Sequence, residues 1–374
     1  MRPLPSCSSL YVHIPFCNTI CPFCDFTKLK SNDTIYQDYC DACCNEINWY
    51  AASPKIQLET IFFGGGTPSC LPISYLKKII KTIFDTFDCS NLKEVTIEIN
   101  PEDVSSHYLS ELYLLGFTRI SLGVQTFDES ECSFLGRGHS VKQSHNALEY
   151  IKASSFDLNI DLMFSLPASS LETLTKSLET ALFYQPNHIS TYSLTIEPGT
   201  LFHKNFVQKA PNDIDFNYYS FIIEFLFSNA FTHYEISSFA LDNHECIHNK
   251  RYWNFDSYIG VGLGAHSFID PYRYSNTSQL KKYLKSSKPS YFINDFQALP
   301  KDTLIKEHII ANLRIPNGIH YDVYKKRYNI DFEKQFHNEI TNLVNQDLIQ
   351  KTAWGFKTTK KGLYLLDNVC LSFL

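Results

Sequence analysis

The sequence predicts an α/β protein built on a partial (β/α)6 barrel, with extra strands and a small C-terminal α+β domain. Six apolar, β-rich runs alternate with helix-like stretches between residues 10 and about 196. Runs that are apolar at nearly every position are typical of parallel strands covered by helices on both faces. Polar and glycine-rich motifs follow the ends of these runs, which is where barrels of this kind place their sites.

The six units follow one another in chain order. "LYVHIPF" is the first expected strand and precedes a helix around 34–50, and helical pattern extends from the fourth strand to about 153. Helices are also expected around 72–87, 102–115 and 171–184. The six expected strands are 10–16, 60–66, 94–100, 119–125, 158–166 and 188–194.

Two further parts follow the barrel, which we assign to residues 1–200. Residues 201–295 contain a helix ("DFNYYSFIIEFLFSNA") and the runs "HYEISSFA" and "YIGVGLGAHSF", which we interpret as extra strands that extend the sheet. Residues 296–374 show three helices and then a hairpin ("QKTAWGFKTTKKG"), the order of a winged-helix domain. The third of these helices carries Glu333, Lys334 and Glu339 and is not basic. A structural or protein-contact role is therefore favoured over DNA binding.

Composition narrows the class of protein. The net charge is -6 and the pI about 6.1, so nucleic acid is not an expected partner. The sequence contains no run of about 18 apolar residues, so no membrane-spanning helix is expected. Its start lacks the pattern of a secretory signal. The 12 cysteines are mostly scattered, and those at 40–44 fit ordinary buried cysteines in a helix. We therefore expect a cytoplasmic protein without a disulfide framework.

Three cysteines lie close together in "YVHIPFCNTICPFCDF". Cys17, Cys21 and Cys24 have the spacing Cys-x3-Cys-x2-Cys, and no second pair follows at the distance that zinc sites usually show. Three cysteines on one tight loop can hold three irons of a [4Fe–4S] cluster and leave the fourth iron open. By spacing alone, a loop of incidental cysteines is the alternative. The glycine-rich "FFGGGTPS" follows the next strand, and its glycines would let the backbone approach a ligand closely.

Together these motifs resemble the radical S-adenosylmethionine (SAM) superfamily, in which the open iron of the cluster binds SAM. The chain resembles more narrowly the HemN/HemW group of that superfamily, which contains oxygen-independent coproporphyrinogen III dehydrogenases and haem chaperones. The resemblance covers essentially the whole chain. It rests on "YVHIPFC", "CPFCDF", "GGGTPS", "EINPE", "ISLGVQTF", "LGRGH", "IDLMFSLP" and "YSLTIEPGT", which occur in this order.

The resemblance implies roles for individual residues. Glu98 and Asp161 are charged residues within apolar strands, which is costly without a partner and favours a function by itself. Arg137 has a solvated loop position as its alternative, and Tyr11 a plain core position. Cys17, Cys21 and Cys24 would ligate the cluster. The residues that would bind SAM are Tyr11, Phe23, Gly65, Gly66, Thr67, Glu98, Gln125, Arg137 and Asp161.

Three features favour a haem chaperone over the dehydrogenase within this group. The dehydrogenases of this group resemble the pattern Cys-x3-Cys-x2-Cys-x-Cys, and Phe26 stands at the position of its fourth cysteine. Those enzymes also carry a long extension before the first strand, whereas here residues 1–10 precede Tyr11. "HNKRYW" resembles the HNxxYW motif of the HemW branch, with His248, Tyr252 and Trp253 as expected haem contacts. A loop histidine without a ligand is the alternative for His248. A radical enzyme acting on an unrelated substrate is the third possibility.

The resemblance also implies cofactors and partners. The expected cofactors are a [4Fe–4S] cluster, SAM and haem. The expected partners are apo-haemoproteins of respiration as haem acceptors and a reductant of the flavodoxin or ferredoxin type. A homodimer and transient contact with membrane proteins are compatible with the resemblance. The sequence leaves open whether SAM is cleaved productively and which atom ligates the haem iron.

Overall fold

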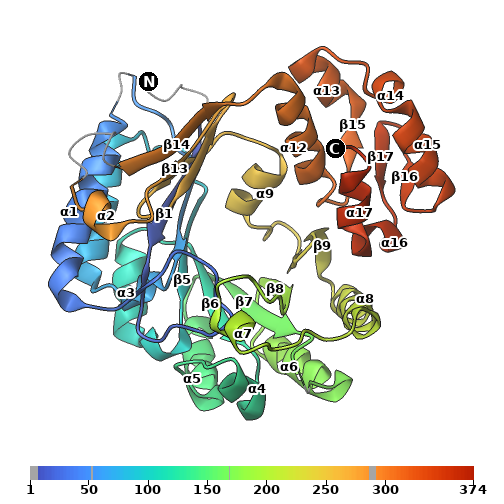
Figure 1. Ribbon diagram of the computed structural model, residues 1–374. Helices are drawn as coiled ribbons and strands as arrows, with labels where there is room; N and C mark the ends of the chain where they lie inside the picture. Colours follow the sequence, from blue (N-terminus) through green and yellow to red (C-terminus); the bar gives the residue numbers. More distant parts are fainter. Residues whose placement is uncertain (1–6, 52–53, 168, 286–291) are drawn as a thin grey trace.

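The computed structural model describes residues 7–51, 54–167, 169–285 and 292–374, and it contains the predicted parallel sheet (Figure 1). Nine strands form one sheet in the order β11-β1-β4-β5-β6-β7-β8-β10-β9. The six strands from β1 to β8 in this order run parallel to one another. They are β1 (Ser9–Ile14), β4 (Thr60–Gly65), β5 (Glu94–Ile99), β6 (Arg119–Gln125), β7 (Asp157–Phe164) and β8 (His188–Ser193).

The two faces of these strands differ in chemistry. In β7, Leu158, Ile160 and Leu162 belong to the main hydrophobic core beneath the helices, whereas Asn159 and Asp161 alternate with them and face polar side chains of neighbouring strands. This alternation follows from the two-residue period of a strand. The interior of the curved sheet is therefore polar, although its strands are buried along almost their whole length.

Helices cover the outer face of the sheet as predicted, with two differences. The helical segment expected to extend to about residue 153 is divided into two helices. Gly136 adopts a φ of 62° after the first helix, and a capping box at Ser140 starts the second. The helix expected from 102 begins at Ser106, after a 3-10 turn at Pro101–Asp103. The helices are α1 (Asp33–Trp49), α2 (Ile73–Thr86), α3 (Ser106–Leu114), α4 (Glu129–Phe134), α5 (Val141–Lys152) and α6 (Leu171–Phe183).

The first expected strand is broken at Pro15, which has no N–H to donate to a neighbour. The chain continues as β2 (Phe16–Cys17), which pairs with β3 (Leu29–Lys30). Because β2 and β3 pair side by side, with Phe16 opposite Leu29, residues 18–28 form a loop whose two ends lie next to each other. We call residues 18–28 the cluster loop.

Strands from residues 201–295 extend the sheet at both edges. β9 (Thr232–Glu235) and β10 (Ser238–Ala240) follow β8 antiparallel, and β11 (Ile259–Val261) lies parallel to β1. The prediction was wrong for the end of "YIGVGLGAHSF", because the chain turns at Gly262 and Gly264, both at positive φ. β12 (His266–Ile269) there starts a separate sheet with β13 (Tyr272–Asn276) and β14 (Ile293–Ala298). The helices of this part are α7 (Leu201–Lys204), α8 (Asn212–Ser228), α9 (Ile247–Trp253) and α10 (Leu280–Tyr283).

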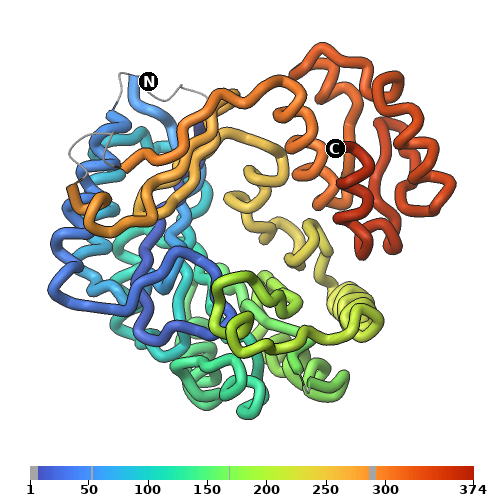
Figure 2. The backbone as a smooth tube through the Cα atoms, in the orientation of Figure 1, coloured from blue at the N-terminus to red at the C-terminus, as the bar shows by residue number. Residues whose placement is uncertain are grey.

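The last part of the chain forms a lobe of its own beside α8 and α9 (Figure 2). It has its own hydrophobic core, to which Phe255 and Phe268 also contribute. The expected order of helices followed by a hairpin is present, but the third expected helix is two helices that meet at Phe336. The elements are α12 (Lys301–Asn312), β15 (Ile319–His320), α13 (Tyr321–Tyr328), α14 (Phe332–Gln335), α15 (His337–Asn345), β16 (Ile349–Lys351), β17 (Gly355–Thr358), α16 (Lys360–Tyr364) and α17 (Leu366–Leu371).

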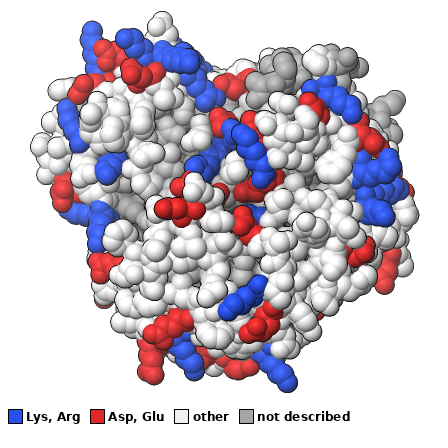
Figure 3. Space-filling model, turned by 180° about the vertical axis from the view of Figure 1, so that it is seen from behind, with Lys and Arg blue, Asp and Glu red and all other residues white. Residues whose placement is uncertain are grey.

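The described helices include none with the length and apolarity that crossing a bilayer requires. On the face seen in Figure 3, basic and acidic side chains are interspersed rather than gathered into one large field of a single sign. Every described cysteine is a free thiol, and Cys40, Cys43 and Cys44 are buried in α1 as expected.

Candidate functional site

The three cysteines lie at the end of β2 and on the cluster loop. Cys17 is buried, and Cys21 and Cys24 are half-buried, joined by a turn in which the Cys24 N–H donates to the Cys21 carbonyl at 3.2 Å. Burial raises the pKa of Cys17 to about 11, against a smaller opposing effect of the Thr67 hydroxyl, which points at its sulfur from 3.7 Å. Burial likewise raises the pKa of Cys24. Without a metal these groups are thiols.

The glycine-rich turn after β4 packs directly against the first cysteine. A Cβ on Gly66 would lie 2.6 Å from the Pro15 carbonyl oxygen and 2.8 Å from the Cys17 sulfur, so no other residue fits there without displacement. Gly65 has a φ of 124°, which side chains rarely adopt. The turn N–H groups bond within the protein: Gly65 donates to the Glu98 carboxylate at 3.1 Å, and Thr67 donates to the Phe16 carbonyl at 2.7 Å. Their predicted contact with SAM stays a prediction.

Two carboxylates, Glu98 on β5 and Asp161 on β7, lie inside the barrel. Burial, and then the nearby charge of Asp161, raises the pKa of Glu98 to about 8. Burial also raises the pKa of Asp161, although Ser121 and Asn159 donate hydrogen bonds to its two oxygens at 2.9 and 2.8 Å. Two half-buried carboxylates whose ionisation is opposed by their surroundings favour a cationic ligand beside them.

The remaining predicted SAM residues occupy different places. Tyr11 lies inside the barrel, where its hydroxyl is 3.0 Å from His13 Nδ1. Gln125 ends β6 at a φ of 70°, beside a register shift between β6 and β7. Phe23 packs against Phe202, with ring centroids 6.3 Å apart.

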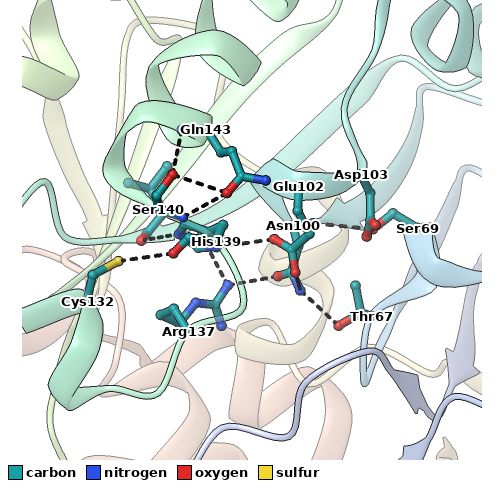
Figure 4. Close-up of polar contacts among 12 residues, drawn as sticks. Thr67, Ser69, Asn100, Glu102, Asp103, Cys132, Arg137, His139, Ser140 and Gln143 are labelled. Atoms are coloured by element: carbon teal, nitrogen blue, oxygen red, sulfur yellow. Dashed lines mark hydrogen bonds and ion pairs between the residues drawn. The ribbon is translucent and has the colours of Figure 1, made fainter. Parts of the chain in front are cut away.

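Arg137 lies against the cluster loop rather than free in solvent. Its Nη1 donates to the Cys21 sulfur at 3.2 Å, and its Nη2 donates to the Gly123 carbonyl at 2.8 Å. The same Nη2 donates to Asn100 Oδ1, also at 2.8 Å (Figure 4). The structure thus brings this predicted SAM residue together with a predicted cluster ligand.

Several residues of this site had no predicted role. Asn100 Nδ2 lies 3.4 Å from the Thr67 hydroxyl and 3.3 Å from Glu102, and Glu102 lies 3.2 Å from Nδ1 of the buried His139. Asn100 and Glu102 belong to the motif "EINPE" and His139 to "LGRGH", so the sequence does mark these residues. Spacing in the sequence does not show that the two motifs meet.

The HNxxYW motif lies at the opposite end of the barrel, on α9. His248 is 1% exposed, with Nδ1 2.8 Å from the hydroxyl of Thr60, the first residue of β4, and Nε2 2.9 Å from the Tyr252 hydroxyl. Burial, and to a smaller extent Arg251, lowers the pKa of His248 to about 3, so the ring is neutral. Both ring nitrogens therefore have partners inside the protein.

Trp253 of the same motif faces the C-terminal lobe. The guanidinium of Arg314 lies over its ring at 5.3 Å, and Asn312 donates to its carbonyl at 2.7 Å. The side chains of His248 and Tyr252 therefore contact each other on the barrel side of α9, whereas Trp253 contacts the C-terminal lobe. Whether these residues contact haem stays a prediction.

Comparison with known proteins places these features in a family. The profile of the Radical SAM superfamily matches residues 11–181. A curated relative named "Heme chaperone HemW" from Lactococcus lactis is 32% identical, with 98% of this chain and 97% of the relative covered. The relative of the same name from Bacillus subtilis is also 32% identical, with 98% and 99% covered. The chain belongs to the HemN/HemW group of the radical SAM superfamily.

The fold of this group member agrees with a solved structure. "Coproporphyrinogen III oxidase (HemN) from Escherichia coli" superposes with a TM-score of 0.85 over 99% of this chain and 91% of that one. The identity is 22%, so this likeness shows the fold alone.

Membership of the radical SAM superfamily implies a [4Fe–4S] cluster and SAM, and the residues fit both. Among the described residues, no three His, Cys, Asp or Glu side chains converge as they would on a single ion. A cubane cluster does not require such convergence, because each thiolate binds a different iron. The three thiols on one loop fit the cluster, and the two carboxylates inside the barrel fit the sulfonium cation of SAM.

Proposed function

We propose that the protein is a haem chaperone that binds haem and delivers it to apo-haemoproteins, with a [4Fe–4S] cluster and SAM as cofactors. The observation that carries this proposal is the similarity over 98% of the chain to curated haem chaperones. Phe26, where the dehydrogenases resemble one another in having a further cysteine, supports it. Oxygen-independent coproporphyrinogen III dehydrogenase is the second candidate, favoured only by the shared fold.

In this proposal Cys17, Cys21 and Cys24 hold the cluster, which supplies an electron to SAM when both are bound. The polypeptide orients SAM. Glu98 and Asp161 offer negative charge to its cation, and the small Gly64 keeps the backbone close to Glu98, since a Cβ there would lie 3.0 Å from the carboxylate. Tyr11 lies in the same interior, and Gln125 ends the neighbouring strand β6.

Haem contact at the HNxxYW motif requires a local rearrangement. His248 Nε2 is free to ligate iron only after the Tyr252 hydroxyl has moved away, because that hydroxyl lies 2.9 Å from it. The neutral ring, held so by burial, is the form that binds a metal. We propose that haem entry displaces Tyr252 and that Tyr252 and Trp253 then pack against the porphyrin.

The proposal extends to partners. The haem acceptors are respiratory apo-haemoproteins, the reductant is of the flavodoxin or ferredoxin type, and the protein acts in the cytoplasm. Transient contact with membrane proteins during delivery and a homodimeric state are compatible with it.

One experiment separates the two functions. The cluster is reconstituted anaerobically and the protein is given haem and then an apo-globin as acceptor. In parallel it is given coproporphyrinogen III with SAM and a reductant. We expect a Soret shift and haem transfer, and no protoporphyrinogen. Protoporphyrinogen formation at catalytic turnover would overturn the chaperone proposal.

The haem ligand is tested with His248→Ala. We expect the Soret shift on haem addition to be lost or strongly weakened. His308→Ala is the matched control, because burial also lowers the pKa of His308 to about 3, but His308 lies in the C-terminal lobe. An unchanged Soret shift in His248→Ala would refute ligation by this residue.

SAM affinity is expected to depend on pH through Glu98. In the protein without ligand this group has a pKa of about 8, so it is largely protonated at neutral pH. A cation bound beside it lowers that pKa, so SAM binding releases a proton and strengthens as pH rises towards 8, by up to about tenfold per pH unit. Dissociation constants measured from pH 6 to 9 on cluster-loaded protein check this. Glu98→Gln should flatten the profile, and a pH-independent wild type would contradict the proposed role of Glu98.

A further inference from the structure

Residues 135–139, which we call the Arg137 loop, lie against the middle of the cluster loop. A Cβ on Gly136 would lie 2.7 Å from Pro22 Cδ, and a Cβ on Gly138 would lie 2.9 Å from Thr19 Oγ1. Thr19 and Pro22 stand on either side of Cys21. The Arg137 loop therefore touches the chain on both sides of this one cysteine, and its two glycines permit that approach.

The loop is anchored away from solvent. His139 is buried, with Nδ1 3.2 Å from the Glu102 carboxylate, and its carbonyl lies 3.8 Å from the Cys132 sulfur (Figure 4). Glu102 belongs to the 3-10 turn after β5. The loop is thus tied to α4 and to the end of β5 by contacts that do not involve the Arg137 side chain.

Arg137 is directed at the Cys21 sulfur by the ends of two strands. Asn100 and the Gly123 carbonyl each accept from Nη2 at 2.8 Å, and these contacts hold one arm of the planar guanidinium. The other arm then points at Cys21, with Nη1 3.2 Å from the sulfur. The Arg137 Nε is buried and has no hydrogen-bond partner among the described residues.

A charged N–H donor at a ligating sulfur stabilises negative charge on an iron–sulfur cluster. Hydrogen bonds to the sulfurs and nearby charges set the reduction potential of such clusters, and a charged donor acts more strongly than a neutral one. We infer that Arg137 is a positioning residue that donates to the Cys21 thiolate of the bound [4Fe–4S] cluster and raises its reduction potential. The inference rests on the proposed function only in that it requires the cluster.

The test is the reduction potential of the cluster, measured by redox titration with electron paramagnetic resonance in the absence of SAM and haem. Arg137→Met should shift the potential to a more negative value, and Arg137→Lys should lie between the two because it keeps the charge but loses the fixed fork. Lys30→Met is the matched control, because Lys30 is an exposed cation at the end of the cluster loop that contacts the Asn18 carbonyl rather than a sulfur. Its potential should match the wild type.

Gly138→Ala gives an independent measurement that leaves the arginine in place. Its Cβ would press on Thr19 and on Glu102, so it should move the Arg137 loop and shift the potential in the same direction as Arg137→Met. If Arg137→Met fails to load iron, Arg137→Lys and Gly138→Ala decide. Potentials equal to that of Lys30→Met in all cluster-bearing variants would overturn the inference. A wild type that takes up no cluster would overturn it together with the proposed function, whereas a cluster-bearing wild type that binds no haem would overturn the proposed function alone.

Discussion

Replacing Cys17, Cys21 or Cys24 singly by alanine is expected to abolish the [4Fe–4S] cluster. In the proposed site each thiolate would hold a different iron and SAM would bind the fourth, so the loss of one thiolate would leave a second iron without a protein ligand. The Thr67 hydroxyl, which points at the Cys17 sulfur from 3.7 Å, is a neutral oxygen and does not replace a thiolate as an iron ligand. Iron and acid-labile sulfide per chain, with the brown absorbance of the reconstituted protein, should fall to near zero.

Cys70→Ala is the matched control for these variants. Cys70 lies beside the cluster loop, where its sulfur donates to the Phe16 carbonyl at 3.2 Å and accepts from the Ser31 hydroxyl at 3.4 Å. It is a neighbouring, partly buried thiol with structural partners of its own, so its variant should keep the full iron content. Full iron in Cys21→Ala, or loss of iron in Cys70→Ala, would contradict the assignment of the three ligands.

The parallel sheet could be predicted because each strand carries its own signal. In β7 the apolar positions 158, 160 and 162 require helices on one face, and the polar positions 159 and 161 require partners on the other. The grouping of Cys17, Cys21 and Cys24 on one loop could be predicted for a similar reason. Their three thiols lie within eight consecutive residues, so local spacing contains most of the site.

The contacts that Arg137 makes could not be predicted in the same way. "LGRGH" shows an arginine between glycines, but Asn100, Gly123 and Cys21 are distant in the sequence, and their meeting depends on how β5, β6 and the cluster loop are arranged. The sequence pattern between the fourth strand and about residue 153 is helical, so it predicted no loop around Arg137. The structure separates α4 from α5 there because Gly136 adopts a positive φ.

The place of the HNxxYW motif was also beyond the sequence. α9 has seven residues, too few for periodicity to define a buried face, and its position depends on groups far away in the chain. Inside the barrel a chain of contacts leads from its start to the carboxylates: the Cys246 N–H donates to Tyr234, Tyr234 lies 2.7 Å from His188, and His188 lies 2.6 Å from Asn159, which donates to Asp161. The motif expected to contact haem and the carboxylates expected to contact SAM are thus two ends of one polar interior.

Glu94→Ala is expected to destabilise the protein strongly at α9. The Glu94 carboxylate, 6% exposed, accepts from the N–H groups of Ile247 at 2.8 Å and His248 at 3.1 Å, and so caps the start of this helix. Arg119, also buried, interacts electrostatically with it. Alanine removes one of the two carboxylates that interact with Arg119 and leaves the N–H groups of Ile247 and His248 without their acceptor, at a cost of about 3–5 kcal/mol in the free energy of unfolding. Denaturant unfolding measures the total, and amide hydrogen exchange at α9 locates it.

Two further variants separate the cap from a general loss of charge. Glu94→Gln keeps the shape and one acceptor oxygen, so it should lose part of the stability and leave α9 more protected from exchange than Glu94→Ala does. Glu59→Ala removes a carboxylate that pairs with Arg251 of the same helix and with Lys93 near the surface, and should cost about 1 kcal/mol or less. Equal losses in Glu94→Ala and Glu59→Ala, or unchanged exchange at α9 in Glu94→Ala, would show that Glu94 does not hold the HNxxYW helix in the barrel. The neutral, fully bonded state of His248 would then need another cause, since its position between Thr60 and Tyr252 follows from where α9 begins.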